Sequence, residues 1–113
     1  MNNDFRVLKH MKQFILSLDS ILINYPKKEK VLKDKIRSTS YELLELILLA
    51  NLKENKLEEQ QLIIVKISML DFYFEESYKK KYISERQALR KTNELSVITK
   101  MMYGWIKNGK CEV

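Results

Sequence analysis

The chain contains very few of the residues that make tight turns, disulfides and metal sites. Its 113 residues include two glycines, one proline, one cysteine and one histidine. An all-β sandwich or a Rossmann-type domain needs many tight turns, so the scarcity of glycine and proline argues against both classes. A single cysteine, Cys111, cannot form an intrachain disulfide, which favours a reducing compartment.

The same scarcity leaves little material for catalysis. The lone histidine, His10, falls within a helical pattern, where an isolated histidine is more often structural or solvated than catalytic. One cysteine and one histidine do not make a metal site, and the two glycines, Gly104 and Gly109, do not form a phosphate-binding loop. The sequence therefore predicts a protein that is not an enzyme and that has no cofactor.

Long hydrophobic runs are also missing. The longest uninterrupted apolar stretches, residues 46–50 and 62–65, are far shorter than the roughly 20 residues that a membrane helix needs. The N-terminal stretch lacks the small-residue cleavage site of a signal peptide. We expect a soluble, cytoplasmic protein with no membrane partner.

The residues that are present favour long helices. Hydrophobic residues make up 45% of the chain and charged residues 32%, and the apolar positions recur every three or four residues. This periodicity predicts one domain over residues 1–113 with helices at about 4–24, 27–51, 57–78 and 84–107. Pro26 separates the first two helices, and Ser84 with Gln87 makes a capping box before the fourth. Similar lengths and short connections predict an all-α, antiparallel up-down-up-down four-helix bundle.

The third predicted helix has more apolar surface than a monomeric bundle needs. Two apolar stripes run along it, one of Leu62, Val65, Met69 and Phe72, the other of Ile63, Ile67, Leu70 and Phe74. Two interpretations remain open at this point. Central helices of a bundle touch two neighbours, or part of this surface meets another subunit of a homo-oligomer.

Positive charge is concentrated in two segments of the chain, whose overall net charge is +6. Residues 27–37 hold six cationic and two anionic side chains, and residues 79–100 hold seven and two. Residues 42–78 have the opposite balance, with eight anionic and three cationic side chains. In an up-down-up-down bundle the first and third connections lie at the same end, so the two basic segments are predicted to meet there.

Such a cluster of lysine and arginine is typical of a polyanion-binding site, although it also serves solubility alone. The candidate nucleic-acid-binding residues are Lys27, Lys28, Lys30, Lys33, Arg37, Lys79, Lys80, Lys81, Arg86, Arg90 and Lys91. Tyr25 and Tyr82 flank the two segments. They either stack on unpaired bases or cap the core.

Short motifs spread over nearly the whole chain carry a resemblance to a known family. They are Tyr25-Pro26-Lys27, Lys35-Ile36-Arg37, Leu43-Leu44-Glu45 and Gly104-Trp105-Ile106. With these motifs the chain resembles the avd-like four-helix-bundle proteins, the accessory variability determinants of diversity-generating retroelements. Family members usually carry a pair of small residues before the tryptophan, and here Tyr103 takes the first of those places.

The resemblance implies an accessory protein without enzymatic activity. Proteins of this kind form a basic, barrel-like pentamer that binds the retroelement reverse transcriptase and its template RNA or DNA, which supports mutagenic cDNA synthesis. A sister group is encoded in intervening sequences of 23S rRNA genes and typically carries proline and glycine in its second helix. Residues 38–44 of this chain contain neither, which favours the retroelement group. The alternatives are an RNA-binding bundle of the rRNA type and a helical adaptor that binds only protein.

Overall fold

The computed structural model describes residues 5–108, and this part of the chain is helical with no strand. The elements follow in the order α1 (Arg6–Leu16), α2 (Asp19–Leu22), the short 3₁₀ helix η1 (Lys27–Glu29), α3 (Lys30–Leu52), α4 (Leu57–Lys79) and α5 (Glu85–Asn108). The predicted all-α class is confirmed.

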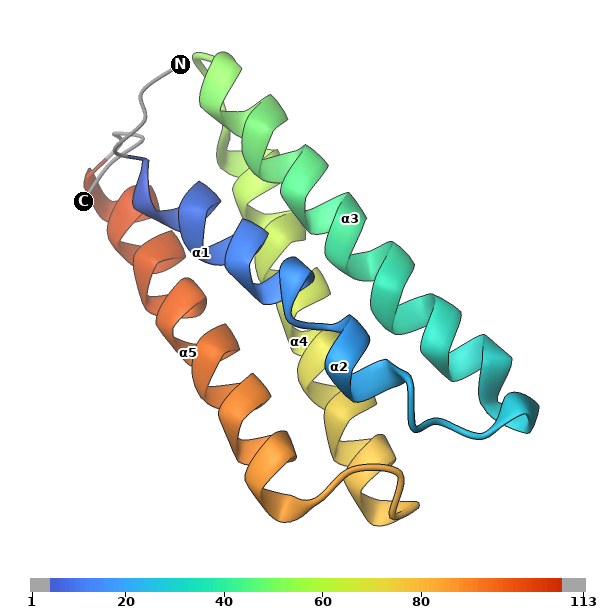
Figure 1. Ribbon diagram of the computed structural model, residues 1–113. Helices are drawn as coiled ribbons and strands as arrows, with labels where there is room; N and C mark the ends of the chain where they lie inside the picture. Colours follow the sequence, from blue (N-terminus) through green and yellow to red (C-terminus); the bar gives the residue numbers. More distant parts are fainter. Residues whose placement is uncertain (1–4, 109–113) are drawn as a thin grey trace.

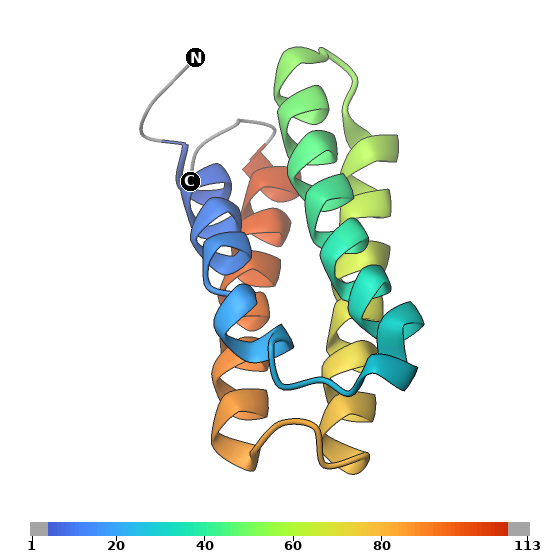
Figure 2. The same ribbon diagram turned by 45° about the vertical axis from the view of Figure 1, so that its right-hand side comes forward.

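The long helices pack as neighbours around one core. Helix α1 contacts α3 and α5, and α4 contacts the same two helices, so the four form a closed ring that fits a bundle. Figures 1 and 2 show the connection between α3 and α4 at one end, near the start of α1 and the end of α5. The η1 segment and the connection between α4 and α5 lie at the other end (Figures 1 and 2).

The bounds of the last three long helices agree with the sequence prediction to within a few residues. The expected capping box marks the start of α5. The backbone N–H of Gln87 donates to the Ser84 hydroxyl over 3.1 Å, and the backbone N–H of Ser84 donates to the side-chain oxygen of Gln87 over 3.0 Å. Helix α3 begins three residues later than expected, because residues 27–29 after Pro26 form a 3₁₀ turn first.

The prediction of one helix over residues 4–24 is wrong. Two helices, α1 and α2, cover this region and are separated at Ser17 and Leu18 (Figure 1). The Ser17 hydroxyl donates to the Phe14 carbonyl over 3.0 Å, and the Leu18 N–H bonds to the Ile15 carbonyl three residues back. A serine that competes for the backbone in this way tightens the turn and ends the regular i to i−4 ladder. Residue 4 lies outside the described residues.

The core is one contiguous cluster built from the apolar lines of all the long helices. Most of the apolar residues that recur every three or four positions along the helices are buried, although Ile15, Leu46, Ala88 and Ile106 are only half-buried. Phe14 of α1 packs edge to face on Phe74 of α4 with ring centroids 6.0 Å apart. Phe5, which immediately precedes α1, packs edge to face on Trp105 of α5 with ring centroids 5.1 Å apart. Aromatic pairs thus connect the α1 region to α4 and to α5.

Candidate nucleic-acid interface

The two basic segments meet at one end of the bundle, as the sequence predicts. We call this region the basic end: residues 27–37 of η1 and α3, together with residues 79–90 of the α4–α5 connection and α5. The η1 segment and the α4–α5 connection are in direct contact here. The Lys80 ammonium lies 3.0 Å from the Glu29 carboxylate, and the Tyr82 hydroxyl donates to the same carboxylate over 2.5 Å.

Glu29 is thus an anion between two groups of cations, and we call its contacts with Tyr82 and Lys80 the Glu29 bridge. The hydrogen bond from Tyr82, followed by the one from Lys80, lowers the pKa of the Glu29 carboxyl below its usual value. The carboxylate therefore stays charged at neutral pH. It fixes the segment before α3 to the segment after α4, and so sets the spacing of the lysines on either side.

Tyr25 and Tyr82 cap the core. Their ring centroids are 5.5 Å apart, and Tyr25 is only 5% exposed. The Tyr82 ring is half-buried, and its hydroxyl is held by Glu29. A base cannot reach the ring of Tyr25 because that ring is buried, so stacking on Tyr25, one alternative from the sequence, is excluded.

Ten of the eleven candidate cations lie at least partly on the surface, but half of these are in ion pairs. The pairs are Lys30–Asp34, Arg37–Asp19, Lys79–Glu75, Lys80–Glu29 with Glu76, and Arg90–Glu94. Within the described residues, no ion pair forms to Lys27, Lys28, Lys33, Lys81 or Arg86. Exposed ion pairs are weak, so the paired cations are held only loosely by their partners, and the five unpaired ones have no ion pair to break within residues 5–108.

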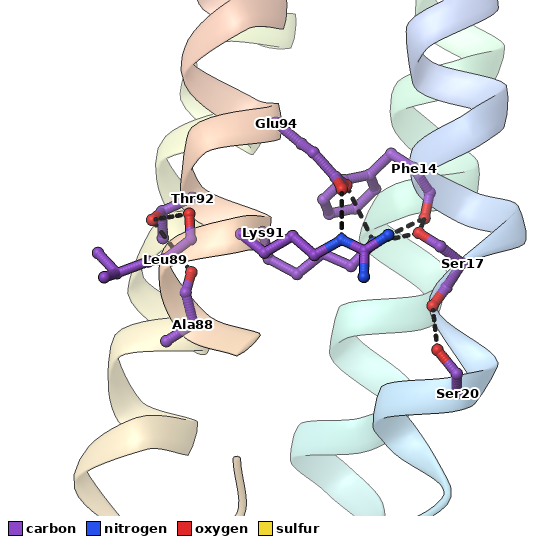
Figure 3. A network of polar contacts seen from close by, with 9 residues as sticks. Phe14, Ser17, Ser20, Ala88, Leu89, Lys91, Thr92 and Glu94 are labelled. Atoms are coloured by element: carbon purple, nitrogen blue, oxygen red, sulfur yellow. Dashed lines mark hydrogen bonds and ion pairs between the residues drawn. The ribbon is translucent and has the colours of Figure 1, made fainter. Parts of the chain in front are cut away.

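The assignment of Lys91 to the nucleic-acid surface is wrong. Its side chain is fully buried between α5 and the end of α1, as Figure 3 shows. The ammonium lies 3.3 Å from the Phe14 carbonyl and 3.0 Å from the Glu94 carboxylate, and it also bonds to the Ser17 hydroxyl. It sits 4.5 Å from the centroid of the Phe14 ring, a cation–π contact.

A signal for this burial was present in the sequence. Lys91 follows Ala88 by three residues and precedes Leu95 by four, which places it on the inward line of α5. Counting lysines by segment overlooks this periodicity. Burial lowers the pKa of the Lys91 ammonium, while the hydrogen bond that the ammonium donates to Glu94 acts in the opposite direction.

Two of the surface hollows lined by charged side chains lie at or near the candidate residues. One, of about 360 Å³, lies on the basic end and is lined by Pro26, Lys27, Lys30, Lys33 and Asp34. The other, of about 240 Å³, lies beside the Lys91 network and is lined by His10, Gln13, Phe14, Ser17, Arg90 and Glu94. Residues 5–108 contain no group of three or more histidine, cysteine or acidic side chains placed to hold a metal ion. Cys111 lies outside that range.

The structure shows that one of the two apolar stripes of α4 is buried and the other is exposed. Ile63, Ile67, Leu70 and Phe74 are buried in the core. The second stripe, which we call the outer stripe, stays exposed: Leu62 43%, Val65 56%, Met69 41% and Phe72 53%. Neighbouring helices of the same chain therefore do not cover it.

Comparison with protein-family models, with curated proteins and with solved structures gave no match. No helix in residues 5–108 is both long enough and apolar enough to cross a membrane.

The Lys91 network predicts a specific pH dependence. The unfolded lysine binds its proton more tightly than the buried one, so stability rises with pH up to the unfolded pKa. We expect the free energy of unfolding of the wild type to rise relative to that of Lys91→Met between pH 7 and about pH 10. Urea denaturation at several pH values measures this, with Lys100→Met, an exposed lysine of the same helix, as the control. Parallel pH curves for the wild type and Lys91→Met would show that Lys91 is not held in a desolvated site.

Proposed function

We propose that the protein is a non-enzymatic accessory protein of a diversity-generating retroelement reverse transcriptase. In this proposal it is cytoplasmic, and its antiparallel up-down-up-down bundle binds the template RNA or DNA through the basic end. The observation that carries the proposal is the Glu29 bridge, which joins two basic segments that are far apart in the sequence into one surface. The sequence resemblance to the avd-like proteins supplies the retroelement context.

Phosphate contacts explain binding by such a surface. Lysine and arginine that neutralise backbone phosphates release bound counterions, which gives affinity for any sequence and a strong dependence on salt. The packed tyrosines support this mode, because base stacking on Tyr25 is not available. We therefore propose recognition of the nucleic-acid backbone, with little preference for sequence.

Self-association is the second part of the proposal. The residues of the outer stripe follow one another at intervals of three, four and three, the a/d spacing of a helix that packs against another helix. An exposed apolar stripe of this kind is typical of an interface. We propose a homo-oligomer, a pentamer by the resemblance, in which several basic ends add their charges.

The basic end gives the first test, by fluorescence anisotropy with a single-stranded RNA of about 20 nucleotides. We expect log K to fall linearly with log salt concentration, and we expect Lys79→Ala/Lys80→Ala/Lys81→Ala to reduce that slope by about 2, since each lost phosphate contact removes about 0.7. The control is Lys100→Ala/Lys107→Ala, which removes exposed lysines from the part of α5 that follows the basic end. Equal binding by the wild type and the triple variant would contradict the proposed surface.

The outer stripe gives the second test. Val65→Glu/Met69→Glu places charges at the centre of the stripe, where burial in an interface is costly. We expect the dissociation constant of the oligomer to rise by about 100-fold or more, measured by multi-angle light scattering at micromolar concentration. Leu89→Glu, at an exposed apolar position of α5 outside the stripe, should leave the assembly intact. A monomeric wild type would remove this part of the proposal.

The reverse transcriptase partner is tested by gene neighbourhood. We expect the gene for this chain to lie beside a reverse transcriptase gene and a pair of variable repeats. A position inside a 23S rRNA gene would favour the rRNA-type bundle instead. Co-purification with the neighbouring reverse transcriptase then tests direct binding.

A further inference from the structure

Lys81 has a backbone conformation that is costly for lysine. Within residues 5–108 it is the one non-glycine residue whose backbone dihedral φ is positive, at 65°. It occupies the position after the end of α4 where helices usually place glycine: its N–H bonds to the Tyr78 carbonyl, and the Tyr82 N–H bonds to the Ser77 carbonyl, both over 2.9 Å. A side chain with a Cβ is disfavoured there by about 1 kcal/mol.

The local structure does not need a lysine at this position. The favourable effect of cations at a helix C-terminus is already supplied by Lys79 and Lys80, which pair with Glu75 and Glu76 one turn back. The Lys81 side chain is exposed and has no ion pair within residues 5–108. Backbone strain at a residue with no structural role points to a function for its side chain.

The neighbours of Lys81 place it beside the other basic segment. Lys80 and Tyr82, on either side of it, are the two residues that bond to Glu29. Lys28 lies next to Glu29 in the chain and is close enough to lower the pKa of its carboxyl, after the larger effects of Tyr82 and Lys80. Lys28 and Lys81, which have no ion pair within residues 5–108, therefore each adjoin a residue of the Glu29 bridge, Lys28 on one segment and Lys81 on the other.

We propose that Lys81 and Lys28 form a single phosphate-binding site for neighbouring phosphates of one nucleic-acid strand, with Glu29 and Tyr82 as positioning residues. This inference rests on the proposed function, since it names the part of the basic end that contacts the backbone. Glu29 lies among cations because it sets their spacing. Lysine at residue 81 supplies a charge that glycine, which would fit the backbone at lower cost, does not have.

The experiment combines binding with stability. Lys81→Gly removes the charge and relieves the strain, so we expect weaker binding to an oligouridine RNA of about 20 nucleotides together with an unchanged or higher Tm. Affinity should fall roughly threefold to tenfold and the salt slope by about 0.7, while Tm rises by up to about 5 °C. Lys81→Arg keeps both the charge and the strain, and should bind like the wild type.

The matched controls separate a site from general charge. Lys28→Ala should lose as much affinity as Lys81→Gly, whereas Lys79→Ala, which removes a paired lysine of the same run, should lose clearly less. Tyr82→Phe keeps the net charge and removes one bond of the Glu29 bridge, and we expect it to weaken binding as well.

Each alternative outcome has a distinct meaning. If the wild type binds RNA but Lys79→Ala and Lys81→Gly lose affinity equally, the basic end acts as diffuse charge and the site is wrong. If Lys81→Gly lowers Tm along with binding, Lys81 is structural. If the wild type does not bind RNA or DNA in a salt-dependent way, the proposed function fails and the site fails with it.

Discussion

The position of the basic end depends on one carboxylate. Glu29 accepts hydrogen bonds from Tyr82 and Lys80, and so ties the segment before α3 to the connection after α4. Without an anion at this place, the two groups of lysines would only repel one another. The same bridge lies beside the packed pair of Tyr25 and Tyr82, which closes the core at this end. Polar and apolar contacts therefore act together at the surface that we propose binds nucleic acid.

The alkyl chain and the ammonium of Lys91 make different contacts inside the bundle. Its alkyl chain belongs to the inward line of α5, and its ammonium binds the groups left by the break between α1 and α2. One lysine is thus used inside the bundle to join α5 to α1. The exposed lysines Lys27, Lys28 and Lys81 have no ion pair within residues 5–108 and join no helices in this way.

Much of the fold followed from periodicity and end signals. The bounds of α3, α4 and α5, the capping box of Ser84 and Gln87 and most of the core were predictable, because each depends on residues close together in the chain. The break at Ser17 and the burial of Lys91 were missed. The break depends on the hydrogen bond from the Ser17 hydroxyl to the Phe14 carbonyl, which the spacing of apolar residues does not reveal. The periodicity of α5 indicated the burial of Lys91, but its hydrogen-bond partners Phe14 and Ser17 lie 77 and 74 positions away in the chain, and no local pattern identifies them.

The amino-acid sequence alone determined the helical class, the approximate lengths of α3, α4 and α5, and the presence of two basic segments and two apolar stripes on α4. Tertiary structure decided which of these residues are exposed at the surface and which are buried. It buried one stripe and left the other exposed, removed Lys91 from the basic end, and packed Tyr25 on Tyr82. The reason is physical: exposure and pairing depend on which helix lies beside a residue, and that neighbour is set by the packing of the whole chain.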